Sequence, residues 1–73
     1  RLGGVRVNTR FYTIMEGDKF LPSSIMKDYT DNIAECIRFN NKEDAEEYLR
    51  WLRKDIDFRV AEVRCIVWIH EME

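Results

Sequence analysis

The sequence predicts a small α+β domain in which one amphipathic helix packs on one face of a three- to four-stranded, mainly antiparallel sheet, in the order β-β-(β)-α-β. Three observations favour this fold. Apolar and polar residues alternate near both ends of the chain, which is the period of a strand. A segment between them repeats its apolar residues with the period of a helix. The chain has 73 residues and is 45% apolar, which is enough for one core and one domain.

The compact domain is expected to span residues 5–70. Residues 1–4 read Arg-Leu-Gly-Gly, a sequence without alternation or helical period. We expect them to form a flexible leader or to be a remnant of processing or cloning.

The first part of the domain, residues 5–21, is expected to form a β-hairpin. Its apolar residues occupy alternate positions from Val5 onward, and a Gly-Asp pair at 17–18 separates two apolar runs. Glycine accepts the positive φ that a two-residue hairpin turn requires. Pro22 lacks a backbone N–H, so the return strand is expected to be short or to lie at an edge.

The middle of the chain is the least regular part. Ile25, Met26 and Tyr29 stand among Ser, Asp, Thr and Asn residues that favour turns, and are expected to fix this loop to the core. Residues 33–39 fit either a continuous helix or a short helical turn followed by a short strand ending at Phe39. The second alternative is favoured.

The clearest local pattern predicts a helix from about residue 41 to residue 54. Its start carries an Asn cap with an acid three residues later, in two possible pairings: Asn40 with Glu43, or Asn41 with Asp44. The apolar residues that follow at helical spacing are Ala45, Tyr48, Leu49 and Leu52. Acids fill the first turns and Arg or Lys the last, which complements the helix macrodipole.

Residues 58–69 predict the longest strand. One face, expected to lie on the core, consists of Ala61, Val63, Cys65, Val67 and Ile69. Phe58 and Val60 are out of phase with that face, so we expect a β-bulge near residues 60–61. The opposite face is polar at first and becomes apolar at Ile66 and Trp68.

Composition argues against several classes of function. Twelve basic residues against fourteen acidic ones give a net charge of −2, which leaves no overall basic footprint for nucleic acid, and no apolar run approaches the length of a membrane span. The single histidine, His70, is near the end of the chain. Cys36 and Cys65 are expected to be free thiols in the apolar interior, with one disulfide as the alternative. We therefore expect a cytoplasmic protein that is not an enzyme, with no catalytic residue, cofactor or metal.

The apolar residues exceed what one helix and one sheet face can use. The surplus falls on the second face of the sheet and predicts a partner-binding surface of Tyr12, Ile14, Ile66 and Trp68, with Arg10 and Arg64 at its rim. The partner is a second protein or, as an alternative, a second copy of the chain. In a further alternative, a curled sheet or the loop 23–32 covers Ile66 and Trp68 and makes them core residues.

Two charged surfaces are weaker alternatives. Single-stranded nucleic acid is expected to favour basic residues interleaved with an aromatic ring, here Arg6, Arg10, Arg59 and Arg64 with Tyr12. An acidic surface that imitates nucleic acid is the other alternative, formed by Asp28, Asp31, Glu35, Glu43, Asp44, Glu46 and Glu47.

The segment FNNKEDAEEYL at residues 39–49 resembles a pattern common in small proteins encoded by phages and mobile elements, where a strand ending in Phe meets a capped helix. Over residues 11–64 the expected element order is also similar to that of small phage inhibitors of host RNA polymerase. The resemblance implies a protein that binds a host protein in the host cytoplasm and blocks or redirects it. It carries over no site residue.

Overall fold

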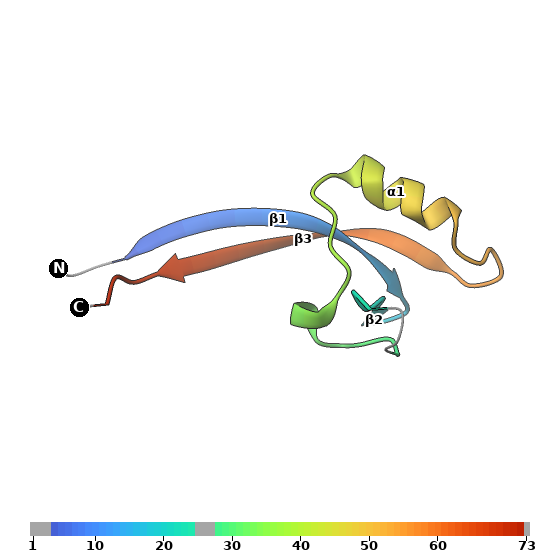
Figure 1. The fold of residues 1–73 in the computed structure, drawn as a ribbon, viewed down its shortest axis with the longest axis horizontal. Coiled ribbons are helices and arrows are strands. Elements are labelled where there is room, and N and C mark those ends of the chain that lie inside the picture. Colours follow the sequence, from blue (N-terminus) through green and yellow to red (C-terminus); the bar gives the residue numbers. More distant parts are fainter. Residues whose placement is uncertain (1–3, 25–27, 73) are drawn as a thin grey trace.

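The computed structural model describes residues 4–24 and 28–72. Along the chain lie β1 (Val5–Glu16), β2 (Lys19–Phe20), the 3-10 turn η1 (Ile33–Glu35), α1 (Lys42–Arg50) and β3 (Phe58–Ile69) (Figure 1). The strands form one antiparallel sheet in the order β2-β1-β3, so the protein belongs to the α+β class as predicted. Residues 1–3 of the expected leader, and Ile25 and Met26 of the expected core-facing loop, lie outside the described residues.

The predicted hairpin turn is confirmed. Glu16 pairs with Lys19, and Gly17 between them has φ 61°. A positive φ at the first of two turn residues is the II′ geometry that glycine favours. β2 is only two residues long, because Pro22 cannot continue the ladder and the chain leaves β1 after the N–H of Leu21 donates to Ile14 O.

β1 and β3 pair along all twelve residues of each strand without interruption. The predicted bulge near residues 60–61 is therefore wrong. Phe58 and Val60 lie on the opposite side of the sheet from Ala61, and all three are half-buried. A bulge would be required only if Phe58, Val60 and Ala61 all had to face one covered side of the sheet. At this end of the ribbon both sides are covered, so residues on either side are half-buried without a bulge.

The segment before the helix is neither a continuous helix nor a strand. A 3-10 turn spans residues 33–35, where the Asn32 side chain accepts a hydrogen bond from Ala34 N. Single bridges follow, from Cys36 to Pro22 and from Phe39 to Tyr12. The favoured prediction of a helical turn before an extended stretch is correct, but two isolated bridges replace the expected fourth strand.

The helix begins as predicted and ends earlier. Asn41 Oδ1 accepts a hydrogen bond of 2.9 Å from Asp44 N, which selects the second of the two proposed caps. The N–H of Trp51 bonds to Tyr48 O three residues back, so the last turn tightens and α1 stops at Arg50. The expected continuation to residue 54 is wrong, because the chain must turn back there to enter β3.

The core sits at one end of the β1–β3 ribbon. Its buried apolar residues are Phe11, Ile14, Leu21, Cys36 and Ala45. Buried Thr13 donates from Oγ1 to Ile37 O at 2.6 Å, which satisfies its hydroxyl group. The Arg38 guanidinium lies 4.4 Å from the centre of the Phe11 ring, a cation–π distance. Tyr29, expected to fix the loop to the core, packs edge-on against Phe58 at 6.1 Å.

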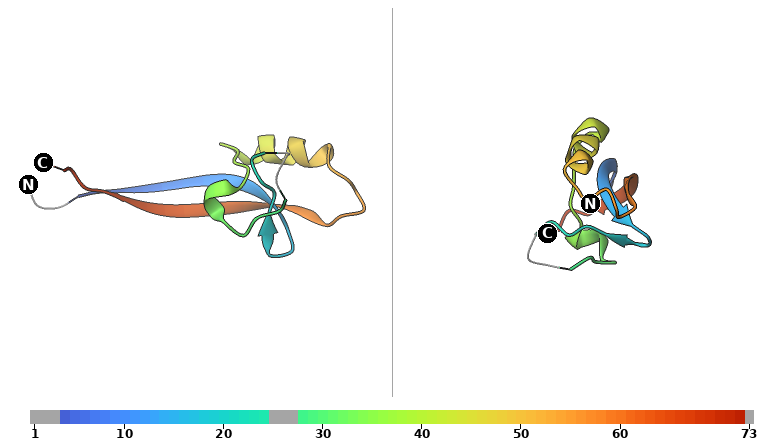
Figure 2. Two further views of the ribbon diagram at one scale, coloured as in Figure 1. Left: turned by 60° about the horizontal axis from the view of Figure 1, so that its bottom comes forward. Right: turned by 90° about the vertical axis from the view of Figure 1, so that its right-hand side faces the viewer.

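Around this core the chain is layered. Figures 1 and 2 place α1 on one side of the β1–β3 ribbon and η1 on the other, with β2 beside the end of β1 in the same sheet. The Tyr48 ring of α1 lies 5.4 Å from the Phe39 ring, which connects the helix to the segment beside β1. Beyond these layers the two long strands continue alone, giving the molecule an elongated shape of 54 × 24 × 18 Å.

Candidate functional site

The part of the ribbon that leaves the core is the most unusual feature of the molecule. We call it the arm: residues 5–10 of β1 paired with residues 64–69 of β3. Figure 1 shows no other element beside it, and all its residues are exposed except half-buried Cys65. An isolated two-stranded ribbon is marginally stable in water, so an uncovered arm that displays large apolar side chains is the candidate site.

One side of the arm carries no charge. This uncharged face consists of three cross-strand pairs: Val5 with Ile69, Val7 with Val67, and Thr9 with Cys65. The sequence interpretation assigned its β3 residues to the core, since they continue the alternation of Ala61 and Val63. The alternation was read correctly, but the core ends before Val67, and the face continues into solvent.

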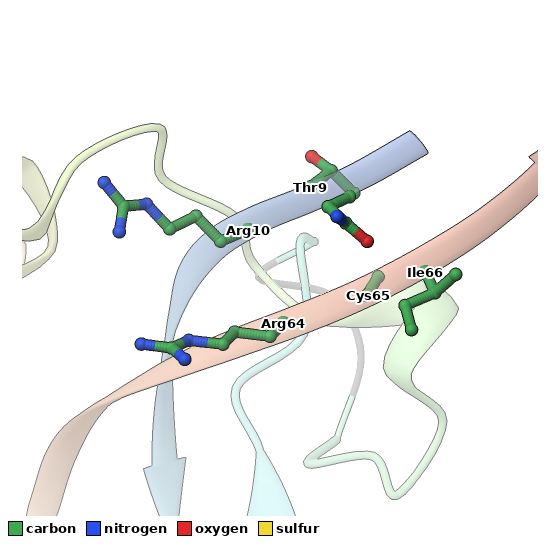
Figure 3. Close-up of a pocket in the computed structure, with 6 residues that line it drawn as sticks. Thr9, Arg10, Arg64, Cys65 and Ile66 are labelled. Atoms are coloured by element: carbon green, nitrogen blue, oxygen red, sulfur yellow. The ribbon is translucent and has the colours of Figure 1, made fainter. Parts of the chain in front are cut away.

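The other side carries the arginines. This arginine face consists of the pairs Arg6 with Trp68, Asn8 with Ile66, and Arg10 with Arg64. Ile66 is 62% exposed and Trp68 is 60% exposed. Figure 3 shows the Arg10 and Arg64 side chains extending in the same direction from neighbouring strands. They line a hollow of about 540 Å³, together with Asn8, Thr9, Cys65 and Ile66.

Glu62 stabilises this pair of like charges. Its carboxylate accepts a 2.5 Å hydrogen bond from Arg64 Nε and a 3.2 Å hydrogen bond from the Tyr12 hydroxyl group. The hydrogen bond from Arg64 is the main cause that lowers the pKa of Glu62; the charge of Arg64, the Tyr12 hydroxyl and the charge of Arg10 act in the same direction. The group forms a polar boundary between the core and the arm.

The six residues predicted as a partner surface share one side of the ribbon. All six have even numbers, and the even-numbered residues of β1 pair with the even-numbered residues of β3. Only four of them lie on the arm. Ile14 is 0% exposed and belongs to the core, so its prediction as a contact residue is wrong. Tyr12 is half-buried and binds Glu62. The twist and cover of the ribbon near α1 bury positions that alternation alone would leave outside.

The proposed nucleic-acid surface is not assembled as predicted. Arg59 occupies an odd position opposite Met15, so it lies on the other side of the ribbon from Arg6 and Arg10. Its guanidinium donates to Gly17 O, at the far end of the molecule from the arm. The arginine that does join Arg6 and Arg10 is Arg64.

The arm also has two free edges. Phe39 and Tyr12 exchange both backbone hydrogen bonds, so the Tyr12 backbone groups point away from β3. Since these directions alternate along an antiparallel strand, Arg6, Asn8 and Arg10 present N–H and C=O groups on the same edge. Among the described residues no strand pairs with that edge of the arm or with the outer edge of β3.

Cys36 and Cys65 are both free, the first buried and the second half-buried. Within residues 4–24 and 28–72 no three His, Cys, Asp or Glu side chains gather as a metal site. None of the described helical segments has the length and apolarity that a membrane crossing requires.

Comparison of the sequence with protein-family models and curated proteins, and of the structure with solved structures, gave no match.

Proposed function

We propose that this chain is a non-enzymatic protein-interaction module that binds a partner protein through the uncharged face of its arm. The observation that supports the proposal is the exposed set of Val5, Val7, Val67 and Ile69 on a part of the ribbon that no other described segment covers. Burial of apolar surface is the main driving force for protein association, and the absence of charge on this face removes the desolvation cost that a charged face would add.

The chemistry of the partner follows from this face. Aliphatic side chains on a flat, two-stranded ribbon fit an apolar groove or the face of a second sheet. In the narrower form that the resemblance to phage inhibitors implies, the partner is a host protein, and binding blocks or redirects it. The arm keeps its conformation through the core at its base, so the partner receives a preorganised surface.

Site-specific photocrosslinking tests this proposal. A photoreactive residue at Val67, in the cells that produce the chain, is expected to give one adduct of defined mass. The same residue at Glu46, an exposed position of α1, serves as the control and is expected to give none. Replacing Val7, the cross-strand neighbour, by Asp should abolish the Val67 adduct and weaken binding of the purified partner by about tenfold or more.

Equal adducts at Val67 and Glu46 would contradict the proposal, as would an adduct that survives Val7→Asp in a chain whose circular dichroism is unchanged. The Val7 position is exposed, so the substitution is expected to leave the core intact.

One observation favours a second candidate, single-stranded nucleic acid on the arginine face. Arg6 pairs with exposed Trp68 there, and Arg10 and Arg64 lie on the same face four residues further along the strands, a combination that allows phosphate contacts and base stacking. In a Trp51→Phe variant, where Trp68 is the only tryptophan, an oligonucleotide should quench its fluorescence, and the affinity should fall as salt rises. Unchanged fluorescence at low salt would exclude this candidate.

A further inference from the structure

The outer edge of β3 has a feature that the function proposed above does not use. β3 is an edge strand, and no described segment pairs with its outer side. The even residues of β3 form the pairs with β1 that lack backbone hydrogen bonds, so their N–H and C=O groups point outward. These residues are Phe58, Val60, Glu62, Arg64, Ile66 and Trp68, and the Phe58 N–H already donates to Ile56 O. A long edge with unpaired N–H and C=O groups is a template for another strand.

The two free edges differ in charge. On β1, Arg6 and Arg10 flank Asn8, so two antiparallel copies of that edge centred on Asn8 would oppose arginine to arginine. Edge charges of this kind prevent self-pairing. The β3 edge has no such protection: residues 65–69 are uncharged, and its two central charges, Glu62 and Arg64, have opposite signs.

The even residues of β3, which share one side of the ribbon, are arranged symmetrically by class around Val63. Moving outward from Val63 in the two directions, one meets an acid and a base, then two aliphatic side chains, then two aromatic rings. The three pairs are Glu62 with Arg64, Val60 with Ile66, and Phe58 with Trp68. On this side the strand is complementary to its own antiparallel copy, because opposite charges face each other and apolar side chains meet apolar ones. On the other side Ala61 meets Cys65, and Arg59 lies beside Val67.

We propose that a second copy of this chain occupies the β3 edge, by antiparallel pairing of β3 with β3 about a two-fold axis at Val63. The two sheets then join into one six-stranded sheet in the order β2-β1-β3-β3-β1-β2. The arm of each copy lies along the core of the other, with Ile66 and Trp68 beside Val60 and Phe58 of the second copy. Two copies of one patch in mutual contact are the normal form of a two-fold dimer.

Charge selects this register over its neighbours. An axis at Arg64 would set that arginine against its own copy. An axis at Cys65 would set Glu62 against Trp68, leaving the acid without a basic neighbour. Only with the axis at Val63 does each Glu62 face Arg64 of the second copy, in addition to the Arg64 it already binds in its own chain.

A charge exchange between copies tests the pairing. The unchanged chain is expected to have the mass of a dimer in light scattering. In a dimer of Glu62→Arg chains, the new arginine of each copy faces Arg64 of the other copy. In a dimer of Arg64→Glu chains, the new acid of each copy faces Glu62 of the other copy. Each variant alone should therefore self-associate about tenfold or more weakly. Mixed in equal amounts, the two variants should form a heterodimer in native mass spectrometry, because every facing pair is again of opposite charge.

The mixture of the two variants is the decisive measurement. The pairing of Glu62 with Arg64 within one chain is lost in both variants and is not restored by mixing. Recovery of the dimer therefore reports only contacts between chains. A monomer at every concentration, or a dimer insensitive to both charge reversals, would overturn the proposal. Circular dichroism of each variant checks that the fold is kept.

A disulfide trap fixes the register independently. In a Cys65→Ser background, Val63→Cys places two thiols across the axis at a pair without backbone hydrogen bonds, where Cα atoms lie about 4.5 Å apart, within disulfide range. Mild oxidation should link the copies. The matched control Val67→Cys, on the same strand and face, should not link, because its two copies would lie many residues apart. Linkage at residue 67 but not at residue 63 would refute the register.

The dimer uses the outer edge of β3, whereas the function proposed above uses the uncharged face. In the β3–β3 register Val67 lies beside Arg59 of the second copy, so a photoreactive residue at Val67 also links two copies, and this adduct has the mass of two chains. The two proposals are tested separately: Val7→Asp should leave the dimer unchanged, and the charge exchange should remove the adduct of two copies while leaving the Val67 adduct with another protein unchanged.

Discussion

Replacing Ile14 by Ala tests the division of the ribbon into a core and an arm. Ile14 is 0% exposed, while Ile66, on the same side of the same ribbon, is 62% exposed. Both are isoleucines at interior positions of strands, so strand propensity changes equally in the two variants. Any difference in their cost reports burial alone.

The magnitude follows from the atoms removed. Ile→Ala deletes three carbon atoms, each worth about 0.8 kcal/mol of transfer free energy when fully buried. At Ile14 the transfer loss is about 2.4 kcal/mol, and the cavity raises the cost to about 3–4 kcal/mol. At Ile66, with most of its surface already in water, we expect about 1 kcal/mol or less. Ile14→Val should cost about 1 kcal/mol.

Urea unfolding followed by circular dichroism measures these free energies. A domain of this length has a total stability of about 4–11 kcal/mol, so Ile14→Ala should shift the midpoint far, or leave part of the chain unfolded in water. The measurement belongs at a protein concentration where self-association is absent. A loss of less than about 1 kcal/mol for Ile14→Ala, or an equal loss for Ile66→Ala, would refute the assignment of Ile14 to the core.

Three further predictions follow from local geometry. Asn41→Ala should lower the unfolding free energy by about 1 kcal/mol, because Asp44 N loses its cap, whereas Asn40→Ala should have little effect; thermal unfolding of the two variants compares them. Gly17→Ala should destabilise by about 1–2 kcal/mol through its positive φ alone, since nothing lies within 4 Å of an added Cβ; urea unfolding would contradict this if the variant were as stable as the parent. The pKa of Glu62 is lowered in the folded chain, so the stability that its ionised form contributes is present at neutral pH and is lost as the pH falls through that lowered pKa. In an NMR titration, Arg64→Gln should raise the pKa of Glu62 toward its ordinary value. An unchanged pKa would show that Arg64 is not the cause.

Local features of the fold could be predicted because their causes are local. Gly17 fixes the hairpin turn by its own conformation. Asn41 fixes the helix start by one hydrogen bond, which its side chain accepts from the backbone N–H of Asp44, three residues later. The period of two along the strands placed the even residues on one side and the odd residues on the other, as the register has them.

The extent of the core could not be predicted in the same way. Val63 and Val67 are the same residue at the same phase of the same strand, yet one is half-buried and the other exposed. What separates them is the cover supplied by distant segments: residues 36–39 beside β1, and α1 over the ribbon. Nothing in the alternation tells where that cover ends, so the sequence interpretation placed the uncharged face of the arm inside the core.

The helix end shows a similar dependence on distant structure. Leu52 continues the apolar spacing of α1, but the chain has only a short connection in which to reach Phe58 and join β1. The helix therefore ends at Arg50, with Trp51 as its C-cap. Lys54 then donates to the Arg50 carbonyl at 3.0 Å, so the basic end predicted to oppose the helix dipole caps the shortened helix.

The uninterrupted pairing of β1 with β3 also determines the order in which the chain folds. Its pairs join residues remote in sequence: Tyr12 and Glu62 are 50 positions apart, and even the last pair at the core end, Glu16 with Phe58, joins residues 42 positions apart. The entropic cost of closing so long a loop arises once, when the core brings the two strands together. Each pair formed afterwards adds only a small further entropic cost. We therefore expect the ribbon to close from the core outward, with the arm forming last and opening first. A partner that recognises the arm thus binds only chains whose core has already folded.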